Sequence, residues 1–287
     1  NPQKLRIFYL CKPLIYEYIN KKVWFMARQS NRNKSKSAQR NSAQKEIEDS
    51  LRIYEIEKLQ KKRASLTKEA FQNDVSVRLS DKQNLLFKGI RNNTLTVVHG
   101  PAGSSKTFTS CYTALSLLAD GKIEKIIITK PIQESGEQIG FLPGTVDEKI
   151  DPYKQSYYTN FCKILDRSTI DWLFSLEQIV FEPLAYMRGS TYDNCIMLLD
   201  ESQNASIKQL MLWSTRLGKD SKAVMMGDTS QYDVKKRDSG YVDFINMTKD
   251  MEDLCIFEFH NEDIVRNKFL IELTNRYDKY RSEYNNL

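Results

Sequence analysis

The sequence predicts an α/β protein whose mainly parallel β-sheet is flanked by helices. Six short apolar runs recur after residue 76, and they are continuous rather than alternating, which is typical of strands covered on both faces. Longer amphipathic stretches separate most of these runs, as expected for crossover helices. A glycine-rich segment directly follows the first run and leads into a predicted helix. No internal repeat interrupts this order.

The N-terminal part of the chain differs from the rest in charge. Residues 1–75 hold 17 Lys and Arg against 8 Asp and Glu, whereas the remaining residues hold 26 against 29. Residues 1–40 predict a basic, disordered tail, because 28–40 contain almost nothing apolar. The spacing of apolar residues predicts a charged helix over 41–75, and 76–287 form the predicted α/β domain. A basic arm is typical of nucleic-acid binding, and equally of a solvated tail that keeps a protein soluble.

The first methionine is Met26, so residues 1–25 are expected to be upstream sequence or part of a larger parent. They lack a small-residue cleavage site after a clean apolar core, and a secretory signal is not expected. No apolar run approaches the roughly 20 residues that span a bilayer, so no membrane partner is expected. The five cysteines include no C-x-x-C pair, which favours reduced thiols in a cytoplasmic protein, and with only two histidines a zinc site is not expected.

The predicted strands follow one another at intervals suited to βα units. In chain order they are 95–99, 125–129, 179–186, 195–200, 222–228 and 254–259.

Residues 97–109, VVHGPAGSSKTFT, resemble a phosphate-binding loop between the first strand and a helix that ends near Gly121. Lys106 would reach the β- and γ-phosphates of a bound nucleotide, and the Thr107 hydroxyl would hold Mg²⁺. Backbone N–H groups of this segment would cradle the phosphates. The candidate nucleotide-binding residues here are Gly100, Pro101, Ala102, Gly103, Ser104, Ser105, Lys106, Thr107 and Phe108.

Ser105 stands where such loops carry a second glycine. It still supplies a backbone N–H, but a positive φ at this position would cost about 1–2 kcal/mol because of its Cβ. An ordinary glycine-rich turn is the alternative interpretation of the segment.

Two later strand exits carry polar groups. Asp200 and Glu201 follow the fourth predicted strand, where Asp200 would bind Mg²⁺ and Glu201 would orient and deprotonate the attacking water. Gly227, Asp228 and Gln231 follow the fifth strand, where a Gln beside a γ-phosphate can sense it or position water. Ordinary turn chemistry is the alternative for this segment. Ligands of parallel sheets bind at the carboxyl ends of the strands, so these groups are expected to meet the phosphate loop.

Together these segments resemble the PhoH-like family of P-loop ATPases, relatives of helicase motor domains. The matching stretches run in the family's order over nearly all of residues 80–280: GPAGSSKT (100–107), ITKPIQESGEQIGFLPGTVDEKIDPY (128–153), EPLAYMRGSTYDN (182–194), LLDESQN (198–204), TRLGKDSK (215–222), GDTSQYD (227–233) and EDIVRN (262–267). Ser190 departs from an arginine often found in the family, as Ser105 departs from its glycine.

The resemblance implies a RecA-like P-loop NTPase fold, ATP and Mg²⁺ as ligands, and a homo-oligomeric ring. It also implies that Gln83 contacts adenine, whereas Gln83 by itself reads as a surface helix residue. Arg266, then Arg188, and less so Arg216, are the candidates for an arginine finger, with surface salt bridges as the alternative for each. The 75 residues before the core are too few for the nuclease domain of some relatives, so a stand-alone ATPase is expected.

The sequence therefore predicts Mg²⁺-dependent ATP hydrolysis coupled to binding or translocation on RNA or single-stranded DNA. A nucleotide-binding switch or scaffold with little turnover is the alternative, because of Ser105. A third reading is a nucleic-acid-binding protein whose affinity lies in the basic arm.

Overall fold

The computed structural model describes residues 68–69, 71, 77–131, 146–228, 238–265 and 267–284. The predicted tail and most of the predicted charged helix lie outside these residues, as do Gln231 and Arg266. The chain divides into two compact units, Asn1–Leu59 and Gln60–Leu287, and the described residues belong to the second. None of the helices in the described part of the chain is long and apolar enough to cross a membrane.

Six parallel strands form one sheet in the order β3-β2-β4-β5-β1-β6. The prediction of an α/β protein with a mainly parallel sheet is confirmed. The bounds of the strands are β1 (Leu95–His99), β2 (Lys125–Thr129), β3 (Ile179–Phe181), β4 (Cys195–Leu199), β5 (Lys222–Gly227) and β6 (Leu254–Glu258).

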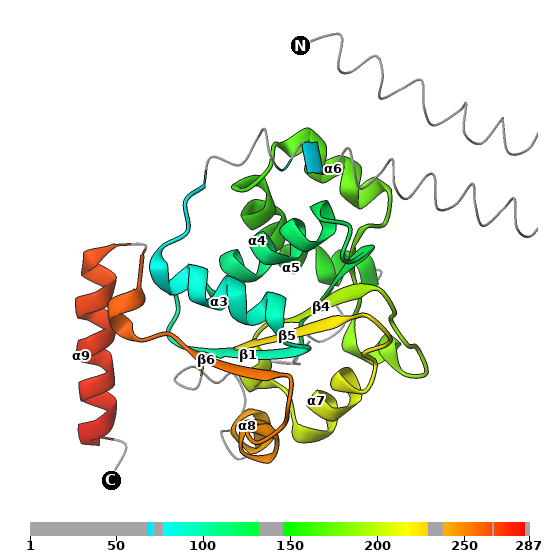
Figure 1. The fold of residues 1–287 in the computed structure, drawn as a ribbon. Helices are drawn as coiled ribbons and strands as arrows, with labels where there is room; N and C mark the ends of the chain where they lie inside the picture. Colours follow the sequence, from blue (N-terminus) through cyan, green and yellow to red (C-terminus); the bar gives the residue numbers. More distant parts are fainter. Residues whose placement is uncertain are drawn as a thin grey trace, which may run out of the picture. The chain divides into compact units, whose positions relative to one another are not determined.

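Helices cover both faces of the sheet, giving three layers (Figure 1). One core cluster joins one face to α3 (Asp81–Asn92), α4 (Lys106–Ala119), α5 (Val146–Cys162) and α6 (Arg167–Ser175). The other joins the opposite face to α7 (Ile207–Ser214) and α8 (Tyr241–Thr248). The C-terminal helix α9 (Lys268–Tyr284) lies beyond β6 in Figure 1, and those of its side chains that the structure describes belong to neither cluster.

The four central strands are buried because both of their faces are covered. β6 is less buried, as expected for an edge strand. All five residues of β4 are buried, which explains why CIMLL has no alternation. The continuous apolar runs thus reflect their place in the middle layer.

The third strand is shorter than its predicted range of 179–186. It ends at Phe181, and Leu184–Met187 form the 3₁₀ helix η2 instead. Pro183 is the N-cap of η2 and, having no N–H, is unsuited to continuing a β-ladder. The apolar residues of this segment still contribute to the core, because Leu184 and Met187 of η2 are buried.

Several helices begin at signals that the sequence carries. Ser80 and Gln83 form a reciprocal capping box at α3, and Ser206 and Gln209 form another at α7. Helix α4 begins directly after the glycine-rich segment and ends at Ala119, close to the expected stop near Gly121. Two further 3₁₀ helices are η3 (Ser202–Asn204), between β4 and α7, and η5 (Asn261–Asp263), after β6.

Candidate functional site

The segment between β1 and α4 is a compact turn that needs two of its glycines. Gly100 has φ 147°, and a Cβ there would lie 2.6 Å from the backbone oxygen of Phe259. Gly103 has φ 86°, a region that L-residues with a side chain rarely adopt. The loop can therefore approach a ligand closely with its backbone.

Ser105 also has a left-handed backbone, with φ 68° and ψ 24°. It is the residue at which the sequence lacks the expected glycine, so the loop keeps the glycine-like conformation in spite of the side chain. The strain expected for a positive φ at this position is present.

Lys106 is the first residue of α4, and its amine folds back over the loop. Its Nζ donates to the backbone oxygens of Gly100 at 2.6 Å and Pro101 at 2.9 Å. Ser104 likewise donates its hydroxyl to Pro101 at 2.8 Å. These bonds close the loop on itself.

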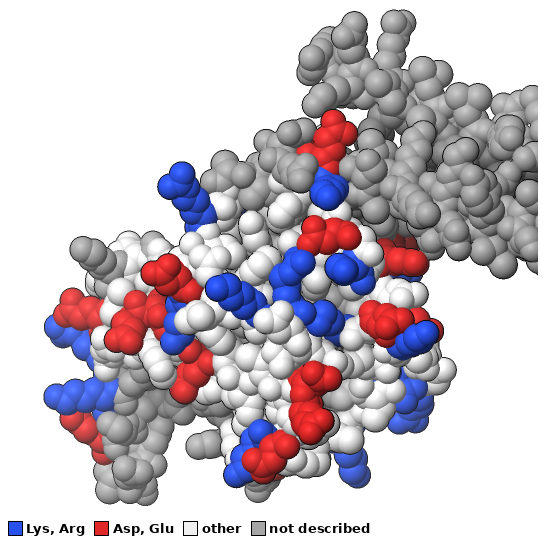
Figure 2. Space-filling view, in the orientation of Figure 1, with Lys and Arg blue, Asp and Glu red and all other residues white. Residues whose placement is uncertain are grey.

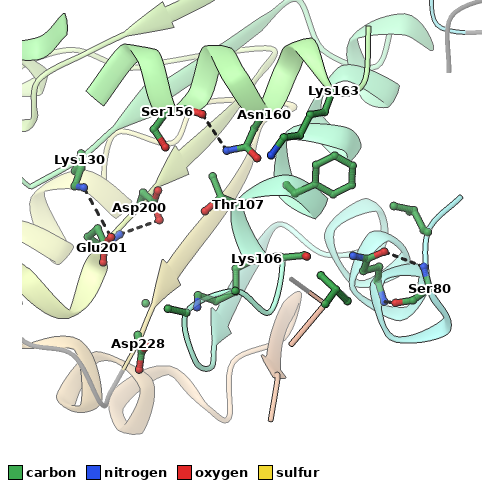
Figure 3. A pocket seen from close by; sticks show the side chains of 18 of the residues that line it. Ser80, Lys106, Thr107, Lys130, Ser156, Asn160, Lys163, Asp200, Glu201 and Asp228 are labelled. Carbon is green, nitrogen blue, oxygen red and sulfur yellow. Dashed lines mark hydrogen bonds and ion pairs between the residues drawn. The ribbon is translucent and has the colours of Figure 1, made fainter. Parts of the chain in front are cut away.

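The exits of β1, β4 and β5 meet around a cavity of about 670 Å³ (Figure 3). Strand β5 lies between β1 and β4, so Asp228 at its exit falls between the loop and Asp200. Of the predicted site residues in the described part of the chain, those that line the cavity are Gln83, Ala102, Gly103, Ser105, Lys106, Thr107, Phe108, Asp200 and Glu201. Gly100, Pro101 and Ser104 do not line it and instead shape the loop.

Asp200 and Glu201, which follow β4, form the acidic end of the cavity. Partial burial and then the neighbouring Glu201 carboxylate raise the pKa of Asp200, while the Lys130 ammonium opposes the shift. Asp200 Oδ1 accepts from the Glu201 backbone N–H at 3.1 Å. Burial, and next the Asp200 charge, also raise the pKa of the Tyr157 hydroxyl well above its ordinary value.

Glu201 has a left-handed backbone, φ 51° and ψ 41°, and its carboxylate has two partners. Gln203 Nε2 donates to Oε2 at 2.7 Å, and Lys130 Nζ lies 3.8 Å from Oε1. Figure 3 shows Lys130 and Glu201 at the end of the cavity next to Asp200, with Thr107 between this end and Ser80.

The oxygen ligands at this end suit Mg²⁺. Asp200 supplies a carboxylate whose surroundings disfavour the unpaired charge, and the Thr107 hydroxyl lines the same cavity. Groups of three or more His, Cys, Asp or Glu that could hold a metal by themselves are absent among the described residues. A cation held partly by a substrate's phosphates needs only one or two protein ligands.

The opposite end of the cavity is formed by the start of α3. Gln83 is buried, 8% exposed, and its Oε1 accepts from the Ser80 backbone N–H at 2.8 Å. The alternative reading of Gln83 as a surface helix residue is therefore wrong. Phe108 of α4 lines the cavity as well, giving an aromatic face beside an amide.

Asp228, which the sequence placed at the exit of the fifth strand, lines the cavity as well. Sequence reasoning missed several other polar residues of the lining: Arg78, Ser80, Lys130, Ser156, Asn160 and Lys163. Lys130 directly follows β2, so the strand-exit rule that found Asp200 would have found it. Ser156 and Asn160 lie one helical turn apart in α5, and Lys163 directly follows this helix. Nothing in the sequence tells that this segment lies over the phosphate loop.

The two described finger candidates lie outside the cavity. Arg216 is committed to its own chain, since Nη1 donates to the Ser190 backbone oxygen at 3.0 Å and Nε to that of Leu212 at 3.2 Å. Arg188 is exposed, which leaves its guanidinium accessible to another molecule.

The family model of PhoH-like proteins matches residues 76–278. The chain belongs to the PhoH-like protein family. It is 38% identical over 189 residues to a PhoH-like protein of Mycobacterium bovis, covering 66% of this chain and 54% of that protein. A PhoH-like protein of Bacillus subtilis is 35% identical over 215 residues, covering 75% and 67%. Protein PhoH of Escherichia coli K12 is 33% identical over 183 residues, covering 63% and 52%.

The chain thus spans about half the length of the M. bovis and E. coli relatives it matches. Two solved structures show more distant similarity. The SWI2/SNF2 ATPase core of Sulfolobus solfataricus in complex with dsDNA has a TM-score of 0.37 at 13% identity, covering 54% of this chain and 33% of that one. The Pif1 helicase of Candida albicans has a TM-score of 0.35 at 14% identity, covering 69% and 44%.

Proposed function

We propose that this PhoH-like protein binds ATP with Mg²⁺ in the cavity and hydrolyses it. The observation that carries the proposal is the meeting of the glycine-rich loop, Lys106 and Thr107 with Asp200 and Glu201 around one cavity. A loop at a helix N-terminus suits phosphates, and a carboxylate pair opposite it suits a metal and an attacking water.

Each residue has one role in this proposal. Lys106 leaves the carbonyl oxygens of Gly100 and Pro101 and binds the β- and γ-phosphates, because an ammonium gains more from phosphate oxygens than from neutral carbonyls. Thr107 and Asp200 hold Mg²⁺, which when bound neutralises charge on the phosphates. Glu201 orients the attacking water and accepts its proton.

The remaining proposed roles are contact with adenine, contact with the γ-phosphate and the arginine finger. Gln83 and Phe108 are proposed to contact adenine at the α3 end of the cavity. Gln231 as the γ-phosphate contact and Arg266 as the finger lie outside the described residues and remain predictions, although Val265 lines the cavity. Among the other arginines, the exposed Arg188 is favoured over Arg216.

A steady-state ATPase assay with and without Mg²⁺ tests the proposal. Lys106→Ala and Glu201→Gln are each expected to lower kcat/KM by about 10²-fold or more, as losses of phosphate binding and of the base do elsewhere. Lys122→Ala, an exposed lysine after α4, is the matched control and retains wild-type activity. Hydrolysis that survives Lys106→Ala undiminished contradicts the assignment of the site.

A nucleotide-binding switch with little turnover is the second candidate. It is favoured by the strained Ser105 and by the ion pair that draws one Glu201 oxygen toward Lys130. Tight ATP binding, hydrolysis below detection, and no gain in turnover from Ser105→Gly or Lys130→Met together support this candidate. Robust wild-type turnover excludes it.

We propose that RNA or single-stranded DNA and neighbouring copies of the chain are the partners of this ATPase, and that it acts in the cytoplasm. Figure 2 shows several Lys and Arg side chains near the middle of the face drawn, with Asp and Glu side chains around them, so the positive charge there is bounded by negative charge. The basic N-terminal arm is the better candidate. Its contribution should fall steeply as salt rises.

Binding of labelled single-stranded RNA and DNA is therefore to be compared between the full chain and a variant lacking 26–40, at several salt concentrations. Equal affinities contradict a role for the arm. A native mass measurement with and without ATP tests the ring, and a monomer under all conditions contradicts it.

A further inference from the structure

Gln203 is a buried polar residue to which the functions above give no role. It lies in η3, two residues after Glu201, and is 1% exposed. A buried carboxamide must have partners for its donors and acceptor, since each unpaired polar group costs free energy.

Its two partners belong to the exits of two adjacent strands. Gln203 Nε2 donates to Glu201 Oε2 at 2.7 Å, and Gln203 Oε1 accepts from the Asp228 backbone N–H at 3.0 Å. Glu201 follows β4 and Asp228 follows β5, and these strands are neighbours in the sheet. The amide thus joins the two strand exits on either side of the cavity's acidic end.

Glu201 needs such a partner to keep one orientation. Its side chain is 40% exposed, and a partly exposed glutamate loses rotamer freedom only when something holds it. The Lys130 ammonium, at 3.8 Å from Oε1, is too distant for a hydrogen bond. The bond from Gln203 is directional and fixes Oε2 of Glu201, whereas the ion pair with Lys130 does not fix Oε1.

We propose that Gln203 is a positioning residue, which orients the Glu201 carboxylate and ties it to the exit of β5. The inference rests on the proposed function, in which Glu201 acts on the attacking water. Through this bridge, a displacement of the β5 exit also displaces the carboxylate. Nucleotide contacts made at that exit are therefore coupled to the orientation of Glu201.

The amide is suited to this bridge because it donates on one side and accepts on the other. Met has a similar length and offers neither bond. An ionised Glu retains an acceptor for the Asp228 N–H but loses the donor to Glu201 and repels it. The two substitutions therefore separate the two halves of the bridge.

The first experiment measures kcat and KM for ATP in Gln203→Met, Gln203→Glu and the wild type. Because the positioned group acts in the chemical step, Gln203→Met lowers kcat by about tenfold or more, as misplacement of a catalytic group does, with KM within about threefold. Gln203→Glu loses at least as much kcat, although it keeps the Asp228 bond. Gln209→Met, which removes the same amide from the α7 capping box away from the cavity, retains the wild-type kcat.

The second experiment detects the bridge without turnover. Urea midpoints are measured for Gln203→Met, Glu201→Gln, the double variant and the wild type. If the two side chains interact as proposed, the two single shifts do not add in the double variant. Glu201→Gln with Gln209→Met is the additive reference pair.

The outcomes separate the two proposals. A wild-type enzyme without turnover, with non-additive midpoints, overturns ATP hydrolysis and supports the bridge. An active wild type, with unchanged kcat in Gln203→Met and additive midpoints, supports hydrolysis and overturns the bridge. A loss of kcat in Gln203→Met equal to that in Gln209→Met also overturns it, since general loss of stability then explains the effect.

Discussion

At the scale of single residues, Ser105 holds the backbone conformation of the glycine it replaces. A left-handed φ costs a residue with a Cβ about 1–2 kcal/mol, and the loop imposes it through its neighbours: Gly103 turns the chain, and Lys106 closes the loop on Gly100 and Pro101. The phosphate loop therefore survives the substitution at a cost in stability rather than in shape.

Ser105→Gly is accordingly expected to stabilise the protein by about 1 kcal/mol, because glycine adopts this φ without strain. Ser110→Gly, in the middle of α4, is the matched control and should destabilise by about 0.5–1 kcal/mol. Urea denaturation measures both. Equal signs for the two substitutions contradict strain at Ser105, and an ATPase assay on the same variants shows whether that strain affects turnover.

Asp200 is a second residue of the site whose surroundings lower the stability of the ligand-free fold. Its pKa is raised in the fold, chiefly by burial, so the folded state binds a proton more tightly than the unfolded chain does. The contribution of Asp200 to the free energy of unfolding is therefore greatest at pH values below the ordinary carboxyl pKa of 3.8. It falls as pH rises through the raised pKa of the folded state. At neutral pH the ionised carboxylate is a cost to the ligand-free fold.

Asp200→Asn is thus expected to raise the midpoint temperature of the ligand-free protein at pH 7.5 by about 2–4 °C, on the order of 1 kcal/mol for a domain of this size. The gain should shrink as pH falls through the raised pKa of Asp200, because the folded carboxyl then binds a proton. Asp250→Asn, at an exposed turn after α8, is the control and should change little. A gain that is independent of pH would show that burial of charge is not the cause.

At the scale of elements, the start of α3 serves both the fold and the cavity. Ser80 and Gln83 cap each other, and both line the cavity. The equivalent pair at α7, Ser206 and Gln209, has the same bonds but lies away from the cavity. The two capping boxes therefore separate a contribution to stability from a contribution to binding.

Gln83→Ala and Gln209→Ala should both lower stability, by about 0.5–2 kcal/mol, because each removes one half of a capping box. Only Gln83→Ala should also weaken ATP binding and reduce any preference for ATP over GTP, as measured by fluorescence titration. Equal nucleotide affinities in the two variants contradict adenine contact by Gln83.

Packing between elements also fixes the position of the β5 exit. The Tyr241 hydroxyl of α8 donates to the Val98 backbone oxygen at 3.0 Å, and its ring covers Gly227, where a Cβ would lie 2.7 Å from ring carbons. Glycine is required here because the α8 tyrosine approaches the strand so closely. This contact packs α8 against the end of β5 on one face of the sheet, whereas α5 covers the opposite face.

At the scale of the whole molecule, nucleotide binding and folding are linked. The cavity is formed by residues that lie far apart in the chain, from Arg78 to Val265, so the unfolded chain cannot bind the same ligand. A ligand that binds only the folded state stabilises it, by about 2.7 kcal/mol at a concentration of 100 Kd.

Mg²⁺ with a non-hydrolysed ATP analogue should therefore raise the midpoint temperature of the wild type by several degrees, about 2–4 °C per kcal/mol. The shift should be absent in Lys106→Ala and present in the control Lys122→Ala. Differential scanning fluorimetry over a series of nucleotide concentrations measures it. A shift that persists in Lys106→Ala places the nucleotide elsewhere.

Much of the site was visible in the chain because it follows strand exits. The loop at 100–107 and the carboxylates Asp200 and Glu201 could be predicted, since apolar runs mark strands and the ends of parallel strands share one edge. The sequence also indicated the strain at Ser105. It did not indicate the shortened third strand, where Pro183 and η2 replace predicted strand residues.

The sequence by itself determined the order of strands along the chain, the phosphate loop and the identity of the acidic pair, because local apolar patterns and turn residues act over a few neighbours. Only the tertiary structure decided that β5 lies between β1 and β4, that Asn160 of α5 and Lys163 after it line the same cavity as the loop, and that Gln203 joins Glu201 to Asp228. These three arrangements depend on contacts between residues distant in sequence, which form when the three layers pack around two core clusters. Such contacts produce no periodic pattern in the sequence from which they could be predicted.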